Sequence, residues 1–309
     1  MSIVDDARRD YLAMLSERRQ EHENTKEETI RKNPSLLEIR KEISRIYTDE
    51  IRGLHNADET DRLVADAEKR FDAEAERLGL AQTVGDYVPL CAECSDTGIA
   101  GGKQCRCVTR HIIEKCYGEG YSSEYASRPE ADSFDTEIYG KEEFRKLAAK
   151  DKKAMLKYIS EFGTSPANLA IIGVPGSGKT LIARIICSEL IAKGCTVMCL
   201  AAYRIVEIFQ EEMFSGEESG MKSLAESCDL LVIDDLGTER QTNFTENLMF
   251  ELIDTRFRAG LPTIITTNLS SEKQKEYYGA RIFSRFYSRC NTVITTPGED
   301  IRLKVNILK

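Results

Sequence analysis

The stretch Gly173-Val-Pro-Gly-Ser-Gly-Lys-Thr180 constrains the fold of this 309-residue chain more than any other part of its sequence. Gly173 and Gly178 bracket four residues and Lys179-Thr180 follow, which gives the pattern G-x-x-x-x-G-K-[ST]. An apolar run at residues 169–172 predicts a buried strand before the pattern, and apolar residues at helical spacing follow it. The sequence therefore predicts a loop that joins a strand of an α/β sheet to the N-terminus of a helix.

The composition of this loop favours the binding of phosphate groups. Glycines let backbone N–H groups turn inward around a phosphate, and the helix dipole adds partial positive charge there. We expect the ammonium of Lys179 to reach the β- and γ-phosphates of a nucleotide, and the hydroxyl of Thr180 to ligate Mg²⁺. The residues predicted to bind ATP are Gly173, Val174, Pro175, Gly176, Ser177, Gly178, Lys179 and Thr180.

Two later strands are predicted to end in polar residues. The run Asp229-Leu-Leu-Val-Ile-Asp-Asp235 places four apolar residues before two acids, which is the Walker B pattern, and a second apolar run leads to Asn268. Ligands bind at the carboxyl ends of the strands in open parallel sheets. We therefore expect Asp234 to orient Mg²⁺ and Asp235 to polarise an attacking water. Asn268 can reach toward the γ-phosphate from an adjacent strand. Alternating strands and helices predict a parallel sheet with right-handed crossovers.

Four cysteines lie close together before this region. Two pairs of them bracket a glycine-rich turn at residues 98–102, and four thiolates at such spacing suit tetrahedral Zn²⁺ in a structural rather than a catalytic site. The predicted zinc ligands are Cys91, Cys94, Cys105 and Cys107. The second pair has only one intervening residue, so His111 or Cys116 remains an alternative ligand.

Charge and composition exclude several classes of protein. The net charge of −9 excludes a polycationic DNA-coating protein, although local basic surfaces remain open. The first 20 residues are highly charged, and no apolar stretch is long enough for a signal peptide or a membrane span, so we expect a cytoplasmic protein. Ten cysteines in such a chain indicate metal ligands and buried thiols.

The first 82 residues are rich in Glu, Arg, Lys and Ala and predict helices. Asn33-Pro34 indicates a break, with Ser35 and Glu38 spaced as a capping box for the next helix. A third helix is expected from about Glu59 to Leu78. Its predicted apolar face consists of Leu63, Ala67, Phe71, Ala75 and Leu78. Such small helices either dock a partner or form a solvated spacer, and the need to cover their apolar faces favours docking.

These patterns divide the chain into four parts. We predict a helical partner-binding region at 1–85, a zinc module at 86–118, a linker at 119–130 and an ATPase domain at 131–309. A basic helix near 141–162 opens the ATPase domain, and its cations form either a solvated face or a nucleic-acid contact.

Taken together and in this order, the motifs resemble those of AAA+ ATPases. The segments Ile-Asp-Asp-Leu-Gly and Arg-Ile-Phe-Ser-Arg-Phe look most like bacterial replicative helicase loaders of the DnaC/DnaI type, and transposition helper ATPases of the IstB type share them. This resemblance covers 131–309. The cysteine segment resembles the zinc module that precedes the ATPase in loaders of the DnaI kind, which favours the loader over the transposition helper.

The resemblance also implies roles for individual residues. Asn268 would be a first sensor, Arg285 an arginine finger offered in trans to a neighbour's γ-phosphate, and Arg302 a second sensor in cis. Arg281 is the rival for the finger, and a surface helix is the structural alternative for both arginines. Asp235 stands where most AAA+ proteins have Glu, which indicates slow hydrolysis.

The implied function is that of an ATPase that loads a hexameric replicative helicase onto single-stranded DNA and self-associates through its ATP sites. Its implied cofactors are ATP, Mg²⁺ and Zn²⁺. A transposition helper ATPase and a metabolic P-loop kinase remain alternatives. Tyr203 and Arg204 are candidates for DNA contact by stacking and phosphate binding, against ordinary helix-start residues.

Overall fold

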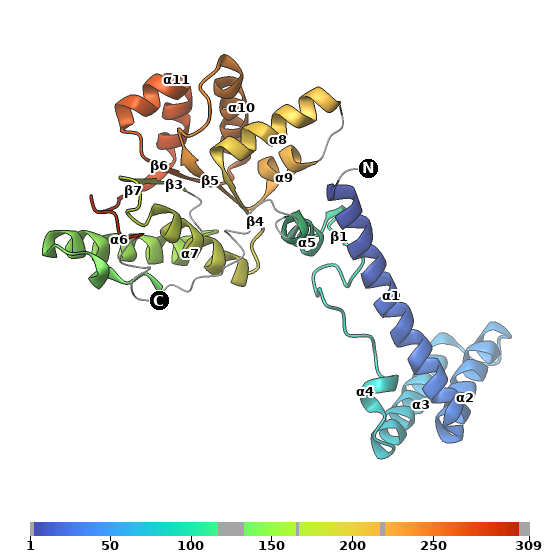
Figure 1. The fold of residues 1–309 in the computed structure, drawn as a ribbon. Coiled ribbons are helices and arrows are strands. Elements are labelled where there is room, and N and C mark those ends of the chain that lie inside the picture. The colour runs from blue at the N-terminus through green and yellow to red at the C-terminus, as the bar shows by residue number, and fades with distance from the viewer. Residues whose placement is uncertain (1–2, 117–132, 165–166, 217–219, 303–309) are drawn as a thin grey trace. The chain divides into compact units, whose positions relative to one another are not determined.

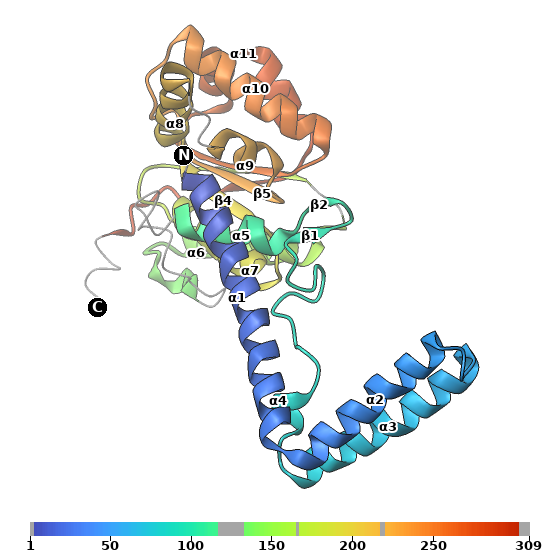
Figure 2. The same ribbon diagram turned by 90° about the vertical axis from the view of Figure 1, so that its right-hand side faces the viewer.

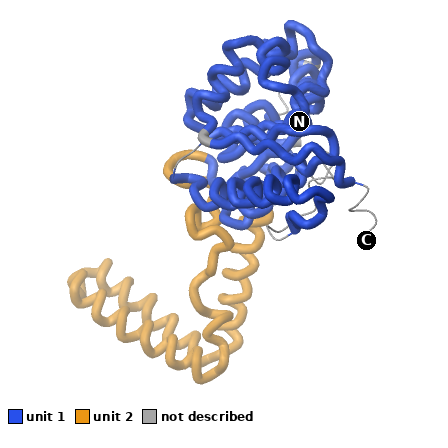
Figure 3. The backbone as a smooth tube through the Cα atoms, turned by 90° about the vertical axis from the view of Figure 1, so that its left-hand side faces the viewer, with its two compact units in different colours: residues 1–9, 104–309 blue, residues 10–103 orange. Residues whose placement is uncertain are grey.

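The computed structural model describes residues 3–116, 133–164, 167–216 and 220–302. The chain divides into two compact units, one of residues 10–103 and one of residues 1–9 with 104–309 (Figure 3). The division between 103 and 104 falls inside the predicted zinc module. The predicted linker at 119–130 lies outside the described residues.

The smaller unit is largely helical. Helix α1 spans Ile3–Lys32 and belongs to this unit from residue 10 on, α2 spans Pro34–Ile51, α3 spans Ala57–Arg77 and the short α4 spans Ala81–Val84. Helices α2 and α3 pack side by side (Figure 2). Two small apolar clusters hold the unit together, one around Ile46, Val64 and Ala67, the other around Ile30, Leu36, Ala75 and Val84.

Three details of the helices differ from the prediction. The second helix begins at Pro34 with Asn33 as its N-cap, two residues before the predicted cap at Ser35, because proline suits the first turn, where no helical N–H bond is lost. The third helix begins at Ala57, since the side chain of Asn56 accepts a hydrogen bond from the backbone N–H of Glu59 at 2.9 Å. Leu63, predicted to be on the apolar face, is exposed, and its neighbour Val64 is buried instead.

A short hairpin and one helix follow. Strands β1 (Ile99–Ala100) and β2 (Lys103–Gln104) are joined by Gly101 and Gly102, which both have positive φ. Helix α5 then spans Arg106–Cys116.

The larger unit contains a five-stranded sheet whose neighbouring strands all pair in parallel. Its strands are β3 (Asn168–Ile172), β4 (Val197–Ala201), β5 (Leu230–Leu236), β6 (Thr263–Thr267) and β7 (Cys290–Thr295). Their order is β4-β5-β6-β3-β7. The predicted parallel α/β sheet is confirmed, and β6 lies between the strand that precedes the glycine-rich loop and the Walker B strand.

Helices cover both faces of this sheet (Figure 1). Helices α6 (Glu142–Glu161) and α7 (Lys179–Ala192) lie on one face. On the other lie α8 (Ala202–Ser215), α9 (Met221–Ser227), α10 (Asn243–Ala259) and α11 (Ser271–Ser288). The core between α7 and the sheet is aliphatic, with Leu169, Ile171, Ile182, Ile186 and Val232 buried. Within the described residues, no helix combines the length and the apolar character that a membrane span requires.

Candidate nucleotide-binding site

The sheet brings the predicted nucleotide residues to one edge. The strands β3, β6 and β5 are neighbours in that order, so their carboxyl ends deliver the glycine-rich loop, Asn268 and the two Walker B acids side by side. The register of β5 shifts after Ile233, and Asp235 adopts a left-handed φ of 52°. That conformation is uncommon for a residue with a side chain and clusters at functional sites.

The glycines of the loop leave room for neighbouring side chains as well as for an approaching phosphate. Gly176 and Gly178 have φ values of 78° and 96°. A Cβ on Gly173 would lie 1.9 Å from Oγ1 of Thr296, and one on Gly176 would lie 2.1 Å from Oδ1 of Asp300. The segment after β7 therefore packs directly on the loop, a constraint that the spacing of the glycines does not reveal.

Lys179 is buried at the start of α7, with 4% of its surface exposed. Its Nζ donates to the carbonyl oxygen of Val174 at 2.9 Å and to Oδ1 of Asn268 at 2.6 Å. Burial lowers the pKa of this ammonium, and the neighbouring Asp235 and Asp234 oppose that effect. The lysine thus lies between the loop and the end of β6, where an anion can satisfy its remaining charge.

The predicted magnesium residues are also brought together. Oγ1 of Thr180 donates to the carboxylate of Asp234, with oxygen–oxygen distances of 3.2 and 3.3 Å. Asp234 is buried at the end of β5 and also accepts a hydrogen bond from Oγ1 of Thr266. The same hydroxyl oxygen accepts the backbone N–H of Asp235 at 2.9 Å. A hydroxyl and a carboxylate are hard oxygen ligands, so this pair fits Mg²⁺.

A cavity of about 440 Å³ opens over these groups. This volume is within the usual range for small-molecule sites. The lining residues are Pro175, Gly176, Gly178, Lys179, Thr180, Leu181, Arg184, Asp235, Asn268, Ile301 and Arg302. The cavity includes three of the four predicted catalytic residues, Asp235, Asn268 and Arg302. It adds Leu181, Arg184 and Ile301, to which the sequence assigned no role.

Residues far from the loop in sequence support it from behind. Tyr139 is fully buried, and its hydroxyl donates to the carbonyl oxygen of Ser177 at 2.9 Å. Burial raises the pKa of Tyr139, so its hydroxyl stays protonated and able to donate. Burial likewise raises the pKa of the nearby Asp151 to about 7. No pattern in the sequence linked these two residues to the loop.

Arg285, the fourth predicted catalytic residue, is not among the residues that line the cavity. It lies on α11, where its Nε donates to Oδ1 of Asp254 on α10 and its guanidinium lies 5.1 Å from the ring centroid of Phe250. About a third of its side chain is exposed. The rival Arg281 lines a different cavity of about 510 Å³ between α10 and α11.

Comparison with known proteins identifies the family of the chain. A model of the IstB-like ATP binding proteins matches residues 137–307, more than half of the chain. The chain belongs to this family. With its five-stranded parallel sheet flanked by helices, it has the AAA+ P-loop fold that the motifs predicted.

The curated relatives of this chain include helicase loaders. The chain is 28% identical over 132 residues to the replicative helicase loader DnaC of Escherichia coli K12, a match that covers 42% of this chain and 54% of that protein. It is 32% identical over 127 residues to the uncharacterized protein YdaV of the same strain, covering 40% and 51%. The chain thus spans about half the length of the curated relatives it matches.

Solved structures give weaker similarity. A crystal structure of the DnaC helicase loader is 19% identical with a TM-score of 0.49, covering 57% of this chain and all of that one. A crystal structure of DnaI is 20% identical with a TM-score of 0.46, covering 57% and 91%.

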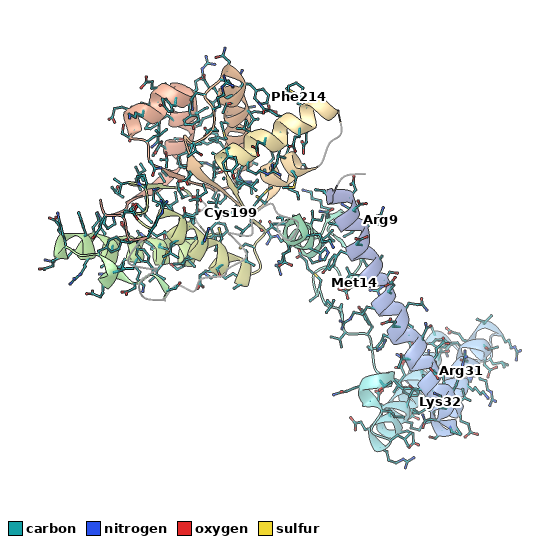
Figure 4. The ribbon with its side chains drawn as sticks, viewed as in Figure 1. Arg9, Met14, Arg31, Lys32, Cys199 and Phe214 are labelled. Carbon is teal, nitrogen blue, oxygen red and sulfur yellow. The ribbon has the colours of Figure 1, made fainter. Side chains whose placement is uncertain are left out.

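The candidate DNA contacts of this IstB-like protein lie at the first turn of α8. The side chain of Tyr203 is half exposed, and Arg204 is in an ion pair with Glu207 at 2.9 Å. At the other end of the same helix, Phe214 is exposed (Figure 4). This geometry leaves the stacking role of Tyr203 a prediction.

The four predicted zinc ligands form one cluster. The Sγ atoms of Cys91, Cys94, Cys105 and Cys107 all lie within 4.8 Å of one another. Four thiolates around Zn²⁺ at about 2.3 Å have sulfur atoms roughly 3.8 Å apart, so the cluster fits a tetrahedral zinc site. Asp96 orders the first pair, because its carboxylate accepts the backbone N–H groups of Leu90 and Cys91, both at 2.9 Å. The alternative ligand His111 is not part of the cluster, and the side chain of Cys116 lies outside the described residues.

Proposed function

We propose that this IstB-like protein is an ATPase that loads a replicative DNA helicase onto single-stranded DNA. The observation that carries the ATPase part is the convergence of Lys179, Thr180 and Asn268 on one cavity, with Asp234 hydrogen-bonded to Thr180 at its edge. The match to relatives named as replicative helicase loaders supports the loader part.

In the proposed reaction the polar residues that the sequence predicted for this site have separate tasks. Lys179 and the loop N–H groups bind the β- and γ-phosphates, while Thr180 and Asp234 would hold Mg²⁺, which neutralises phosphate charge. Asp235 orients the attacking water, and Asn268 contacts the γ-phosphate beside Lys179. Arg302 acts on the nucleotide in its own subunit. Because aspartate is shorter than the glutamate common at this position, we expect slow turnover.

Arg285 is proposed to act on a neighbouring subunit. Its position outside the cavity of its own chain supports a role in trans, where a planar guanidinium stabilises the charge on a γ-phosphate. Adjacent subunits would then share each ATP site, and ATP would promote self-association into a ring segment or spiral.

The helical unit is proposed to dock the helicase. Four large apolar side chains are exposed around the end of α2 and the start of α3, with Ile51 88% exposed. They are Tyr47, Ile51, Leu54 and Leu63. Exposed apolar surface is typical of protein–protein contacts, so these four residues support the proposed docking role. We also propose that the protein is cytoplasmic. Tyr203 and Arg204 are proposed to contact single-stranded DNA.

The cysteine cluster is proposed to hold one structural zinc per chain. Elemental analysis of the purified protein should give one zinc per chain, and Cys105→Ser should lose it and lower the melting temperature. Cys195→Ser, a thiol outside the cluster, serves as the matched control and should keep the metal. A wild-type protein that is well folded without zinc would refute the assignment.

A transposition helper ATPase is the second candidate function, and the IstB-like family membership favours it. Pull-down experiments with the chain as bait separate the two. We expect the replicative helicase of the source organism to be retained, and Ile51→Asp to lose it while Glu50→Lys, its neighbour, keeps it. Retention of a transposase instead of the helicase would favour the second candidate.

A further inference from the structure

One carboxylate on α10 holds two arginines. Oδ1 of Asp254 accepts a hydrogen bond from Nε of Arg285 on α11, and Oδ2 forms an ion pair with Nε of Arg258 at 2.8 Å. The carboxylate is only 11% exposed, so the contact to Arg285 is shielded from water. Phe250 lies one helical turn before Asp254, and its ring covers one face of the same Arg285 guanidinium. Arg285 is thus fixed along one edge and over one face.

This arrangement leaves the far edge of the guanidinium available. In the part of the chain that the structure describes, the hydrogen bond from Arg285 to Asp254 uses Nε alone, and neither Nη atom makes a hydrogen bond or an ion pair to another residue. The charges also do not cancel, because one carboxylate is shared by two guanidinium groups. The group of Asp254, Arg258 and Arg285 therefore keeps a net positive charge, with Nη donors in the fork geometry that suits a phosphate.

We propose that Asp254 is a positioning residue that fixes Arg285 for contact with the γ-phosphate of ATP bound to a second copy of this chain. The inference rests on the proposed trans role of Arg285. An arginine side chain without such support loses rotamer freedom when it engages a phosphate. Asp254 and Phe250 remove that freedom beforehand, so the guanidinium enters the transition state already oriented.

A purely structural ion pair between α10 and α11 is the competing explanation. Loss of such a pair would lower the free energy of unfolding of Asp254→Ala and of Arg285→Ala alike, and it would leave the kcat of folded Asp254→Ala at the wild-type value. A positioning role predicts that the loss of Asp254 lowers turnover through Arg285 and leaves ATP affinity in the same chain unchanged. These differences can be measured.

The test compares Asp254→Ala, Arg285→Ala and the double variant for ATP affinity, kcat and melting temperature. For Asp254→Ala we expect ATP affinity within about twofold of wild type and a kcat about 10- to 10²-fold lower, the size of loss that misplacement of a reacting group causes. The double variant should have the kcat of Arg285→Ala alone. Glu251→Ala, an exposed acid on the same helix, is the matched control and should keep wild-type kcat.

The conservative change Asp254→Asn keeps the test valid if Asp254→Ala does not fold. Its amide oxygen still accepts from Nε of Arg285 but carries no charge, so its kcat should lie between those of wild type and Asp254→Ala. A wild-type kcat in Asp254→Asn and Asp254→Ala, with Arg285→Ala impaired, would overturn this inference alone. A wild-type kcat in Arg285→Ala would instead refute the finger, and the inference with it. Additive losses of kcat in the double variant would mean that Asp254 does not act through Arg285, which would also overturn the inference.

Discussion

The nucleotide cavity and the Arg285 surface are organised in opposite ways. In the cavity, Lys179, Thr180 and Asp234 are linked to one another or to Asn268 by hydrogen bonds within one chain. At the other surface, Arg285 is held by Asp254 and Phe250, and within the described part of the chain neither of its Nη atoms makes a hydrogen bond to another residue. The first region is assembled to bind a ligand within its own chain. The second is assembled to present one charged group to something outside that chain.

Because of this contrast, substitutions in the two regions should have different effects. A change in the cavity should remove nucleotide binding, and a change at the Arg285 surface should remove turnover alone. Changes behind the cavity should alter stability more than chemistry, since they support the loop without lining the site.

The largest effect is expected at Lys179. Lys179→Ala removes the ammonium that contacts the loop and Asn268, so ATP binding should become unmeasurable while the fold is kept. Titration with a fluorescent ATP analogue measures the affinity, and Lys153→Ala, an exposed lysine on α6, is the control. Retained nucleotide affinity with an unchanged melting temperature would contradict the assignment of this loop.

A smaller effect, on stability, is expected at Asp151 on α6. Burial raises the pKa of this carboxyl to about 7 from a reference value of 3.8, so between these pH values the folded protein binds more protons than the unfolded chain. Its contribution to the free energy of unfolding is therefore complete below pH 4 and is lost as pH rises toward 7 and beyond, by up to roughly 4 kcal/mol.

Asp151→Asn should remove this dependence. Chemical denaturation should show the variant more stable than wild type at pH 8, with a smaller gain or none at pH 5. Glu143→Gln, an exposed acid on the same helix, should show no such difference. An equal effect of Asp151→Asn at both pH values would contradict the prediction.

The smallest effect is expected at Tyr139. Tyr139→Phe removes the hydroxyl that donates to the carbonyl oxygen of Ser177 and leaves that carbonyl without this donor, at a cost of about 1 kcal/mol. The melting temperature should fall slightly, and ATP affinity should fall by a few fold because the loop loses support. Tyr277→Phe, on α11, is the control and should change neither quantity. An ATP affinity in Tyr139→Phe equal to that of wild type would show that the Tyr139 hydroxyl does not support nucleotide binding by the loop.

The sequence predicts the cavity well because its parts are local patterns. The loop, the Walker B acids and Asn268 each follow a recognisable strand, and parallel pairing must bring strand ends to one edge. Helix α10 (Asn243–Ala259) likewise ends at a local signal, because Gly260 follows it in a left-handed conformation. These features depend on a few neighbouring residues.

Contacts between distant segments were not predictable in this way. The packing of Thr296 and Asp300 on the loop, the Tyr139 hydrogen bond and the pairing of Asp254 with Arg285 each join residues more than 30 positions apart. Nothing in the local pattern of an acid on a helix shows which arginine it will meet. The N-cap at Asn33 was missed for a different reason, because the capping-box spacing of Ser35 and Glu38 pointed to Ser35, whereas Pro34 already occupies the first turn of the helix.

The central claim is that the ATP site is completed across two chains. Arg285→Ala subunits keep their cavity, and Lys179→Ala subunits keep their arginine, so each variant alone should be inactive or nearly so. When the two are mixed at constant total protein, ATP turnover should recover in part and should peak at intermediate ratios. No recovery at any ratio, together with a loss of ATP affinity in Arg285→Ala alone, would contradict the claim and place the role of Arg285 within its own chain.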